Sequence, residues 1–207
     1  MIGQRGDAHA WDERYRASEL LWSAEPNRFL VEEAASLPAR RALDLACGEG
    51  RNAVWLAGRG WLVTGVDFSQ VALEKARALA DDRGVHVEWV LADLLAYEPQ
   101  PRGFELVLVL YLQLPAAQRT AVMARAATAV APGGTLLIVA HDRANLEHGF
   151  GGPRDPAVLY TAQDLANDLR DSGLRIERAE QVERPVRQAD GCHVALDALL
   201  RAVRPSE

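Results

Sequence analysis

The chain of 207 residues is long enough for one sizeable α/β domain and short for two. Hydrophobic residues make up 49% and charged residues 25%, and the net charge of -6 gives no general attraction to nucleic acid or to an anionic membrane surface. The only cysteines, Cys47 and Cys192, form no C-x-x-C pair, so we expect neither a disulfide framework nor a metal site. No apolar run approaches the length of a membrane span, and we expect a cytoplasmic protein.

The N-terminal part is expected to be helical over residues 11–37, with a break near residues 23–26 and a second helix opened by Pro26. Trp11, Tyr15 and Trp22 are spaced i, i+4 and i+11, so all three can share one helix face. Such an aromatic stripe either packs on the domain or covers a bound cofactor as a lid.

A buried strand, a glycine turn and a helix are predicted over residues 42–53. Gly48 and Gly50 allow a tight turn and a close approach of the backbone to a ligand. The pattern from Gly48 to Ala53 fits the weak G-x-G-x-x-G/A signature of nucleotide binding. Asp44 lies inside the strand, where a lone carboxylate is costly unless it binds an ammonium group or fixes the N–H groups of the turn.

Strands and helices alternate along the rest of the chain. A helix capped by Ser69, another starting at Pro115 and a third with a capping box at Thr161 are expected. The expected strands cover residues 61–66, 85–91, 104–111, 135–140, 174–182 and 192–203. The last two, separated by Arg184-Pro185, are expected to pair antiparallel, because no crossover helix lies between them. The sequence therefore predicts an α/β protein with a doubly wound, seven-stranded, mostly parallel sheet and an antiparallel C-terminal hairpin.

Two carboxylates follow the second and third predicted strands, at the edge of an open α/β sheet where ligands bind. Asp67 can accept the hydroxyl groups of a ribose, which NAD and S-adenosylmethionine share, or it can cap the next helix. Asp93 can accept a hydrogen bond from an adenine amino group, with Ala92 and Leu94 against the ring. Asp44 favours S-adenosylmethionine, because it suits an amino group and would repel a pyrophosphate.

These motifs resemble those of the class I S-adenosylmethionine-dependent methyltransferases. Residues 43–50 look like the first motif of that family, and Asp67, Ala92-Asp93 and residues 132–135 fall at the spacings of its later motifs. The resemblance covers residues 40–140 well and implies a Rossmann-like methyltransferase fold. Residues 11–15 together with Trp22 further resemble the N-terminal lid of the thiopurine and tellurite-resistance branch. That branch implies a lid over the cofactor, formed by residues 1–37, on a single methyltransferase domain of residues 38–207.

The resemblance implies S-adenosyl-L-methionine as cofactor, S-adenosyl-L-homocysteine (SAH) as product and a small molecule, not a nucleic acid, as acceptor. We expect the cofactor to be bound by Trp11, Tyr15, Trp22, Asp44, Ala46, Gly48, Gly50, Arg51, Asn52, Asp67, Phe68, Ala92, Asp93, Leu94 and Leu110. Two alternatives stay open at this point: an NAD-dependent oxidoreductase and a non-catalytic module that binds S-adenosylmethionine.

A general base is needed only if the acceptor is a hydroxyl group or an amine. His141, after the fifth strand, is the candidate base, although a histidine at a strand end can equally serve the structure. Asp142, Tyr111 and Gln113 are further candidates for contact with the substrate. The glycine-rich loop of residues 149–153 either closes over a substrate or simply connects two elements.

Overall fold

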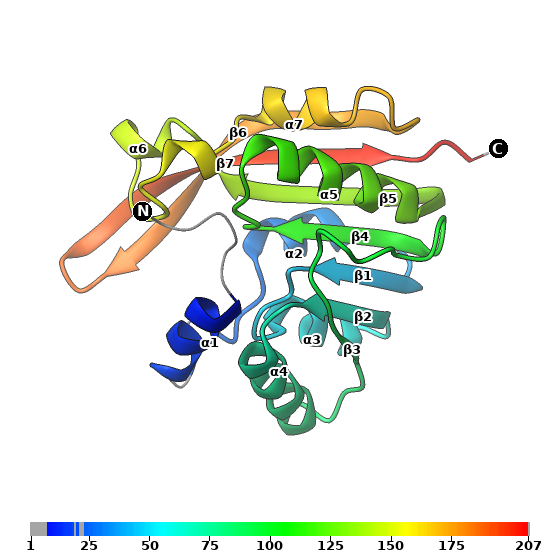
Figure 1. Ribbon diagram of the computed structural model, residues 1–207, viewed down its shortest axis with the longest axis horizontal. Coiled ribbons are helices and arrows are strands. Elements are labelled where there is room, and N and C mark those ends of the chain that lie inside the picture. Colours follow the sequence, from blue (N-terminus) through cyan, green and yellow to red (C-terminus); the bar gives the residue numbers. More distant parts are fainter. Residues whose placement is uncertain (1–7, 19, 21–22, 207) are drawn as a thin grey trace. The chain divides into compact units, whose positions relative to one another are not determined.

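A computed structural model describes residues 8–18, 20 and 23–206, so the predicted cofactor residue Trp22 lies outside the described residues. The chain divides into two compact units, Met1–Glu98 and Pro99–Glu207. Seven strands form one mixed sheet in the order β3-β2-β1-β4-β5-β7-β6 (Figure 1). The predicted α/β fold, with a mostly parallel sheet and an antiparallel C-terminal hairpin, is confirmed.

The first unit alternates helices with three parallel strands. Its elements are α1 (Ala8–Arg16), α2 (Arg28–Ala34), β1 (Arg41–Leu45), α3 (Arg51–Ala57), β2 (Leu62–Asp67), α4 (Gln70–Asp82) and β3 (Glu88–Leu91). The predicted cap of α4 is confirmed, because the Ser69 hydroxyl accepts a hydrogen bond from the N–H of Ala72 at 3.1 Å. Pro26 does not open α2; the cap is Asn27, whose side chain accepts from the N–H groups of Phe29 and Leu30.

The second unit carries one parallel strand pair and the terminal hairpin. Its elements are β4 (Phe104–Leu110), α5 (Ala116–Ala129), β5 (Val130–His141), α6 (Asn145–His148), the 3-10 helix η1 (Pro156–Val158), α7 (Ala162–Asp168), β6 (Arg175–Gln188) and β7 (Gly191–Val203). The capping box at Thr161 is confirmed, and α5 and α7 lie against the strands of this unit (Figure 1). No helix among the described residues is long and apolar enough to cross a membrane.

The terminal hairpin differs from its predicted boundaries. β6 runs through Arg184-Pro185 without a break, and Pro185 pairs with Val194 of β7. β6 is the last strand of the sheet, and an edge strand tolerates proline because a missing N–H on its outer side removes no ladder bond. β5 pairs with β7 only from Asp197 onward, so residues 191–196 pair with β6 alone and form the arm drawn in orange and red in Figure 1.

Candidate functional site

The glycine turn between β1 and α3 has the backbone that its residues predict. Gly48 and Gly50 have φ angles of 55° and 78°, and Ala46 has a φ of 60°, which is unusual for a residue with a side chain. A Cβ added to Gly50 would lie 2.6 Å from the indole of Trp89, so this turn requires glycine at position 50. A Cβ added to Gly48 would lie 3.0 Å from the hydroxyl oxygen of Tyr15.

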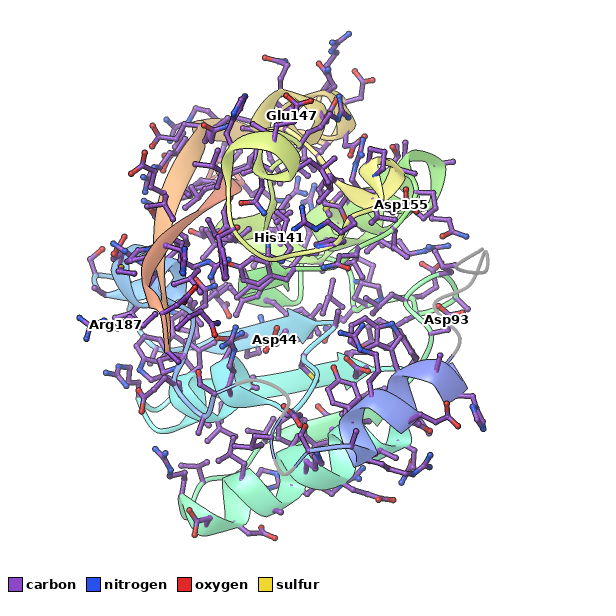
Figure 2. The ribbon with its side chains drawn as sticks, turned by 90° about the vertical axis from the view of Figure 1, so that its left-hand side faces the viewer. Asp44, Asp93, His141, Glu147, Asp155 and Arg187 are labelled. Atoms are coloured by element: carbon purple, nitrogen blue, oxygen red, sulfur yellow. The ribbon has the colours of Figure 1, made fainter. Side chains whose placement is uncertain are left out.

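Asp44 is a buried carboxylate at the end of β1, with 1% of its surface exposed. Its Oδ2 atom has no hydrogen-bond partner among the described residues. Burial, and next the charge of Asp67, raise its pKa to about 7, against the opposing effects of Arg51 and the N–H of Ala53. The Oδ2 of Asp44 is therefore an acceptor without a donor, on β1 just before the glycine turn (Figure 2).

Asp67, at the end of β2, holds the turn in place. Its Oδ2 accepts from the N–H of Gly48 at 2.8 Å, and its Oδ1 accepts from the N–H of Ser69 at 2.9 Å. Burial raises its pKa although these backbone N–H groups favour the charged form. The alternative role of Asp67 as a helix cap is wrong, since Ser69 caps α4.

Helix α1 packs on the glycine turn and on α4. Tyr15 is buried against Val71 and Ala72, and Trp11 packs against this cluster, with 5.7 Å between the ring centroids of Trp11 and Tyr15. The Tyr15 hydroxyl occupies the space that a side chain at position 48 would enter. Trp11 and Tyr15 therefore pack on α4, and whether they also cover a bound cofactor stays a proposal.

Lys75 of α4 holds α1 in place through hydrogen bonds, a role that the sequence alone does not predict. Its ammonium donates to the carbonyl oxygens of Tyr15 and Ser18 and lies 3.2 Å from Oε1 of Glu49, which is buried in the turn. Asp12 of α1 also accepts a hydrogen bond from the hydroxyl of Ser69. Lys75 is the only lysine of the chain, a signal that could have drawn attention to it.

Replacing Lys75 by methionine is expected to loosen α1. The end of α1 loses its donor, and the buried Glu49 loses its ammonium partner, so the free energy of unfolding should fall by about 1–3 kcal/mol. Urea unfolding measures this loss, and limited proteolysis should cut near α1 faster than in the unsubstituted protein. Arg77→Met, on the exposed side of the same helix, is the control. Equal proteolysis of the two variants would contradict the role of Lys75.

The remaining predicted cofactor residues of the first unit differ in their burial and in their hydrogen bonds. Asn52 is buried, and its Oδ1 accepts from the N–H of Asn27 at 2.8 Å, so it also fixes the start of α2. Asp93 is exposed after β3 and accepts from the N–H of Leu95 (Figure 2). Leu94 is buried, whereas the half-buried predicted residues are Arg51, Phe68 and Ala92.

The second unit contains a polar cluster around Asp197 of β7. The Asp197 carboxylate is fully buried; its Oδ2 accepts from the Tyr111 hydroxyl at 2.7 Å and from Nε of Arg184 at 2.6 Å. Nδ1 of His141 lies 3.3 Å from its Oδ1. Burial alone would raise the pKa of Asp197, but the nearby His141 ring and the hydrogen bonds from Arg184 and Tyr111 lower it below its usual value.

Strand register brings these side chains together. His141 and Asp197 are direct partners in the antiparallel pair of β5 and β7. The residue of β6 that pairs with Asp197 lies two positions before Arg184. The side chain of Arg184 therefore points to the same face of the sheet as Asp197. Tyr111 has a φ of 58°, and this left-handed backbone directly follows β4. His141 and Tyr111 are candidates from the sequence alone, whereas Asp197 and Arg184 are not.

The loop after α6 lies on the His141 ring. A Cβ added to Gly152 would lie 3.1 Å from both Cγ and Nδ1 of His141. Asn145 holds the loop, because its side chain accepts from the N–H of Leu196 at 2.7 Å and donates to the carbonyl of Gly151 at 2.8 Å. Phe150 stacks on His193 of the hairpin arm at a centroid distance of 4.0 Å. This loop therefore covers one side of the imidazole.

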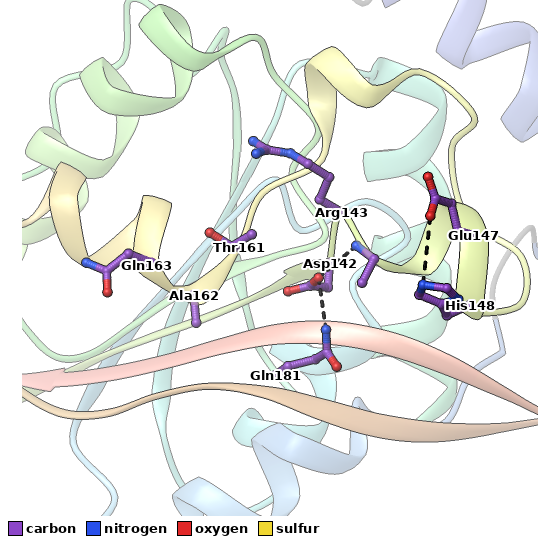
Figure 3. Close-up of a pocket in the computed structure, with 9 residues that line it drawn as sticks. Asp142, Arg143, Glu147, His148, Thr161, Ala162, Gln163 and Gln181 are labelled. Carbon is purple, nitrogen blue, oxygen red and sulfur yellow. Dashed lines mark hydrogen bonds and ion pairs between the residues drawn. The ribbon is translucent and has the colours of Figure 1, made fainter.

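A cavity of about 560 Å³ opens next to the end of β5 (Figure 3). Asp142, a predicted candidate for substrate contact, is buried there and accepts from Nε2 of Gln181 at 3.1 Å and from the N–H of Ala144 at 2.9 Å. The other lining residues are Arg143, Glu147, His148, Thr161, Ala162 and Gln163. Asp142 thus ties the strand end to β6. Among the described residues, no three His, Cys, Asp or Glu side chains are grouped to hold a metal ion.

The geometry of the first unit fits the cofactor that the sequence predicts. An α-ammonium group would give the unpartnered Oδ2 of Asp44 the donor that it lacks. Gly48 and Gly50 keep side chains off the turn, so a ligand can approach its backbone closely. A buried acidic group at this position would instead repel a pyrophosphate.

Residues 42–134 match the family described as "Methyltransferase domain". The chain is 30% identical over 186 residues to the ubiquinone biosynthesis O-methyltransferase of Pseudomonas syringae pv. tomato, an alignment that covers 82% of this chain and 80% of that protein. TehB from Haemophilus influenzae has a similar fold, with a TM-score of 0.71, 17% identity and coverage of 86% of this chain and 62% of that one. Magnesium protoporphyrin IX methyltransferase from Synechocystis PCC 6803, solved with bound SAH, has a TM-score of 0.65, 21% identity and coverage of 96% and 83%.

Proposed function

Since this chain belongs to the class I S-adenosylmethionine-dependent methyltransferases and transfers a methyl group to a small molecule, we propose that the acceptor atom is an oxygen and that His141 takes up its proton. Membership of this family excludes the NAD-dependent oxidoreductase considered above. The observation that carries the proposal is the contact of 3.3 Å between Nδ1 of His141 and the buried carboxylate of Asp197.

We propose that Nε2 of His141 is the base, because Nδ1, which has no hydrogen-bond partner among the described residues, lies 3.3 Å from Oδ1 of Asp197. When Nδ1–H is donated to the carboxylate, Nε2 keeps its lone pair and can accept a proton. With 13% of its side chain exposed, His141 is accessible but largely shielded from water. The relative from Pseudomonas syringae is itself named an O-methyltransferase, which supports an oxygen acceptor.

The cofactor's sulfonium supplies an activated methyl group, so the chain has to bind, orient and shield the reactants. We propose that Asp44 accepts from the ammonium group and that Asp67, already fixed by Gly48 and Ser69, accepts from the ribose hydroxyls. Asp93 is proposed to accept from the adenine amino group. We propose that the other residues predicted from the sequence to bind the cofactor also contact it. Among them, Leu110 is buried at the end of β4 in the second unit.

Further proposals concern the division of the chain, the acceptor, the partners and the location of the protein. We propose that residues 1–37 act as the cofactor lid and that residues 38–207 form the methyltransferase domain. The resemblance to the thiopurine and tellurite-resistance branch supports a small acceptor. The net charge of -6 disfavours nucleic acid as a partner, and a cytoplasmic location is proposed from the cysteine usage.

Cofactor binding is expected to depend on pH through Asp44. Because its pKa is raised from 3.8 to about 7, Asp44 makes the folded, ligand-free protein progressively less stable as the pH rises from 3.8 to about 7, with no further loss above that pH. The ammonium group of SAH requires the ionised carboxylate, so SAH affinity should fall about tenfold for each pH unit below 7. Isothermal titration calorimetry from pH 5.5 to pH 8 measures this slope, and Asp44→Asn should flatten it. An equal slope in that variant would assign the dependence to another group.

A panel of acceptors tests the proposed function. Phenols, catechols, thiols and small amines are each incubated with S-adenosylmethionine, and kcat/KM is obtained from the SAH formed. The proposal predicts the highest kcat/KM for a phenol or a catechol. A preference for thiols or amines, or no transfer to any phenol or catechol, would contradict it.

A further inference from the structure

We propose that Arg184 is a positioning residue that acts on His141 through Asp197, balancing the charge of the carboxylate so that the imidazole stays neutral and able to accept a proton. The inference rests on the proposed role of His141 as a base. It concerns a residue of β6 that is not among the residues proposed above to bind the cofactor.

The contacts place Asp197 between Arg184 and His141. Arg184 donates through Nε to Oδ2 at 2.6 Å and through Nη2 to Oδ1 at 3.4 Å. His141 reaches the same carboxylate through Nδ1 at 3.3 Å from Oδ1. The carboxylate of Asp197 therefore lies beside the cationic Arg184 of β6 and beside His141 of β5, which is cationic when protonated. Both strands pair with β7.

The groups facing His141 come from four elements. Asp197 lies on β7 and Arg184 on β6, while Tyr111 follows β4 with its ring centroid 4.8 Å from that of the imidazole. The guanidinium of Arg184 lies 5.4 Å from the centroid of the Tyr111 ring. Asn145 of α6 and Gly152 of the following loop, both neutral, lie next to the ring. One negative and one positive charge therefore dominate the surroundings of His141.

Because the charges of Arg184 and Asp197 balance, Asp197 can orient the His141 ring without also favouring its protonated form. A carboxylate alone would hold Nδ1–H but would also stabilise the imidazolium, which cannot act as a base. With Arg184 paired to the same carboxylate, Asp197 keeps its orienting contact while its net field at the ring is reduced. Side-chain exposures of 24% for Arg184 and 0% for Asp197 keep this effect from being screened away by water.

Titration of the His141 ring by NMR tests the proposal without any acceptor or cofactor. Ring nitrogen shifts are followed against pH, and the His141 signal is assigned by its absence in His141→Gln. Arg184→Met should raise the titration midpoint of His141 by about one pH unit, because Asp197 is left uncompensated. Asp197→Asn should lower it by a similar amount, and the double variant should return close to the unsubstituted protein.

Two further variants control the experiment. Arg184→Lys keeps the charge and should leave the midpoint near that of the unsubstituted protein, even if Arg184→Met folds poorly. Arg187→Met, on the exposed tip of the same strand, should have no effect (Figure 2). An unchanged midpoint in Arg184→Met, or an equal rise in Arg184→Lys, would overturn the proposal. Failure of the oxygen acceptor in the panel would leave this titration unaffected, so the two failures are distinguishable.

Discussion

Replacing His141 by glutamine is expected to lower kcat for a phenol or catechol acceptor by about 10²–10⁴-fold, the range for loss of a general base. Glutamine retains a side chain that can contact Asp197 but has no nitrogen able to take up a proton. The affinity for SAH should be unchanged, since no proposed cofactor contact is removed. Initial rates of SAH formation and calorimetric titration with SAH measure the two quantities.

His148→Gln is the matched control for His141→Gln. His148 lies on α6 with an exposed side chain that is paired with Glu147 (Figure 3), so its replacement should leave kcat unchanged. Equal rates in the two variants would remove His141 from the reaction. A loss of SAH affinity in His141→Gln would instead point to disturbed packing of the loop at Gly152.

Asp44→Asn is expected to weaken SAH binding by about tenfold to a hundredfold, because a charge-assisted hydrogen bond to the ammonium group is lost. The same variant should be more stable than the unsubstituted protein at pH 8 without ligand. At that pH the carboxylate is ionised in a buried site that raises its pKa to about 7, and asparagine carries no such charge.

These opposite effects make the Asp44 test specific. A variant that unfolds more easily could lose affinity for trivial reasons, but one that gains stability cannot. Thermal unfolding at pH 8 and calorimetry with SAH give the two values, and Asp81→Asn on the exposed face of α4 serves as the control. Unchanged SAH affinity in Asp44→Asn would assign the ammonium group to another partner.

The cofactor half of the site could be predicted because its signals are local. A carboxylate inside an apolar strand marked Asp44, and the glycines that follow it adopt the left-handed backbone that glycine tolerates. Asp197 carries the same signal, since it interrupts the apolar run of residues 194–200. It escaped prediction because only the register of β5 against β7 places it opposite His141.

Contacts between distant residues explain the other differences. Lys75 reaches carbonyl groups that lie 60 and 57 residues earlier in the chain, and no local pattern encodes such a contact. The predicted break at Arg184-Pro185 assumed that proline ends a strand, which holds for central strands and fails at the edge of a sheet. The apolar runs were thus enough to predict the fold. Whether a rule for a single residue holds, such as proline ending a strand, depends on where its strand lies in the sheet.

The nature of the acceptor atom is tested most directly by transfer of a ¹³C-labelled methyl group. S-adenosylmethionine labelled in its methyl group is incubated with the protein and an equimolar mixture of a catechol, a thiol and an amine. The carbon chemical shift of the labelled product then identifies the atom that carries the methyl group. Our account predicts a methyl group on oxygen, formed by the unsubstituted protein and lost in His141→Gln. A labelled methyl group on sulfur or nitrogen, or an oxygen product formed equally well without His141, would contradict it.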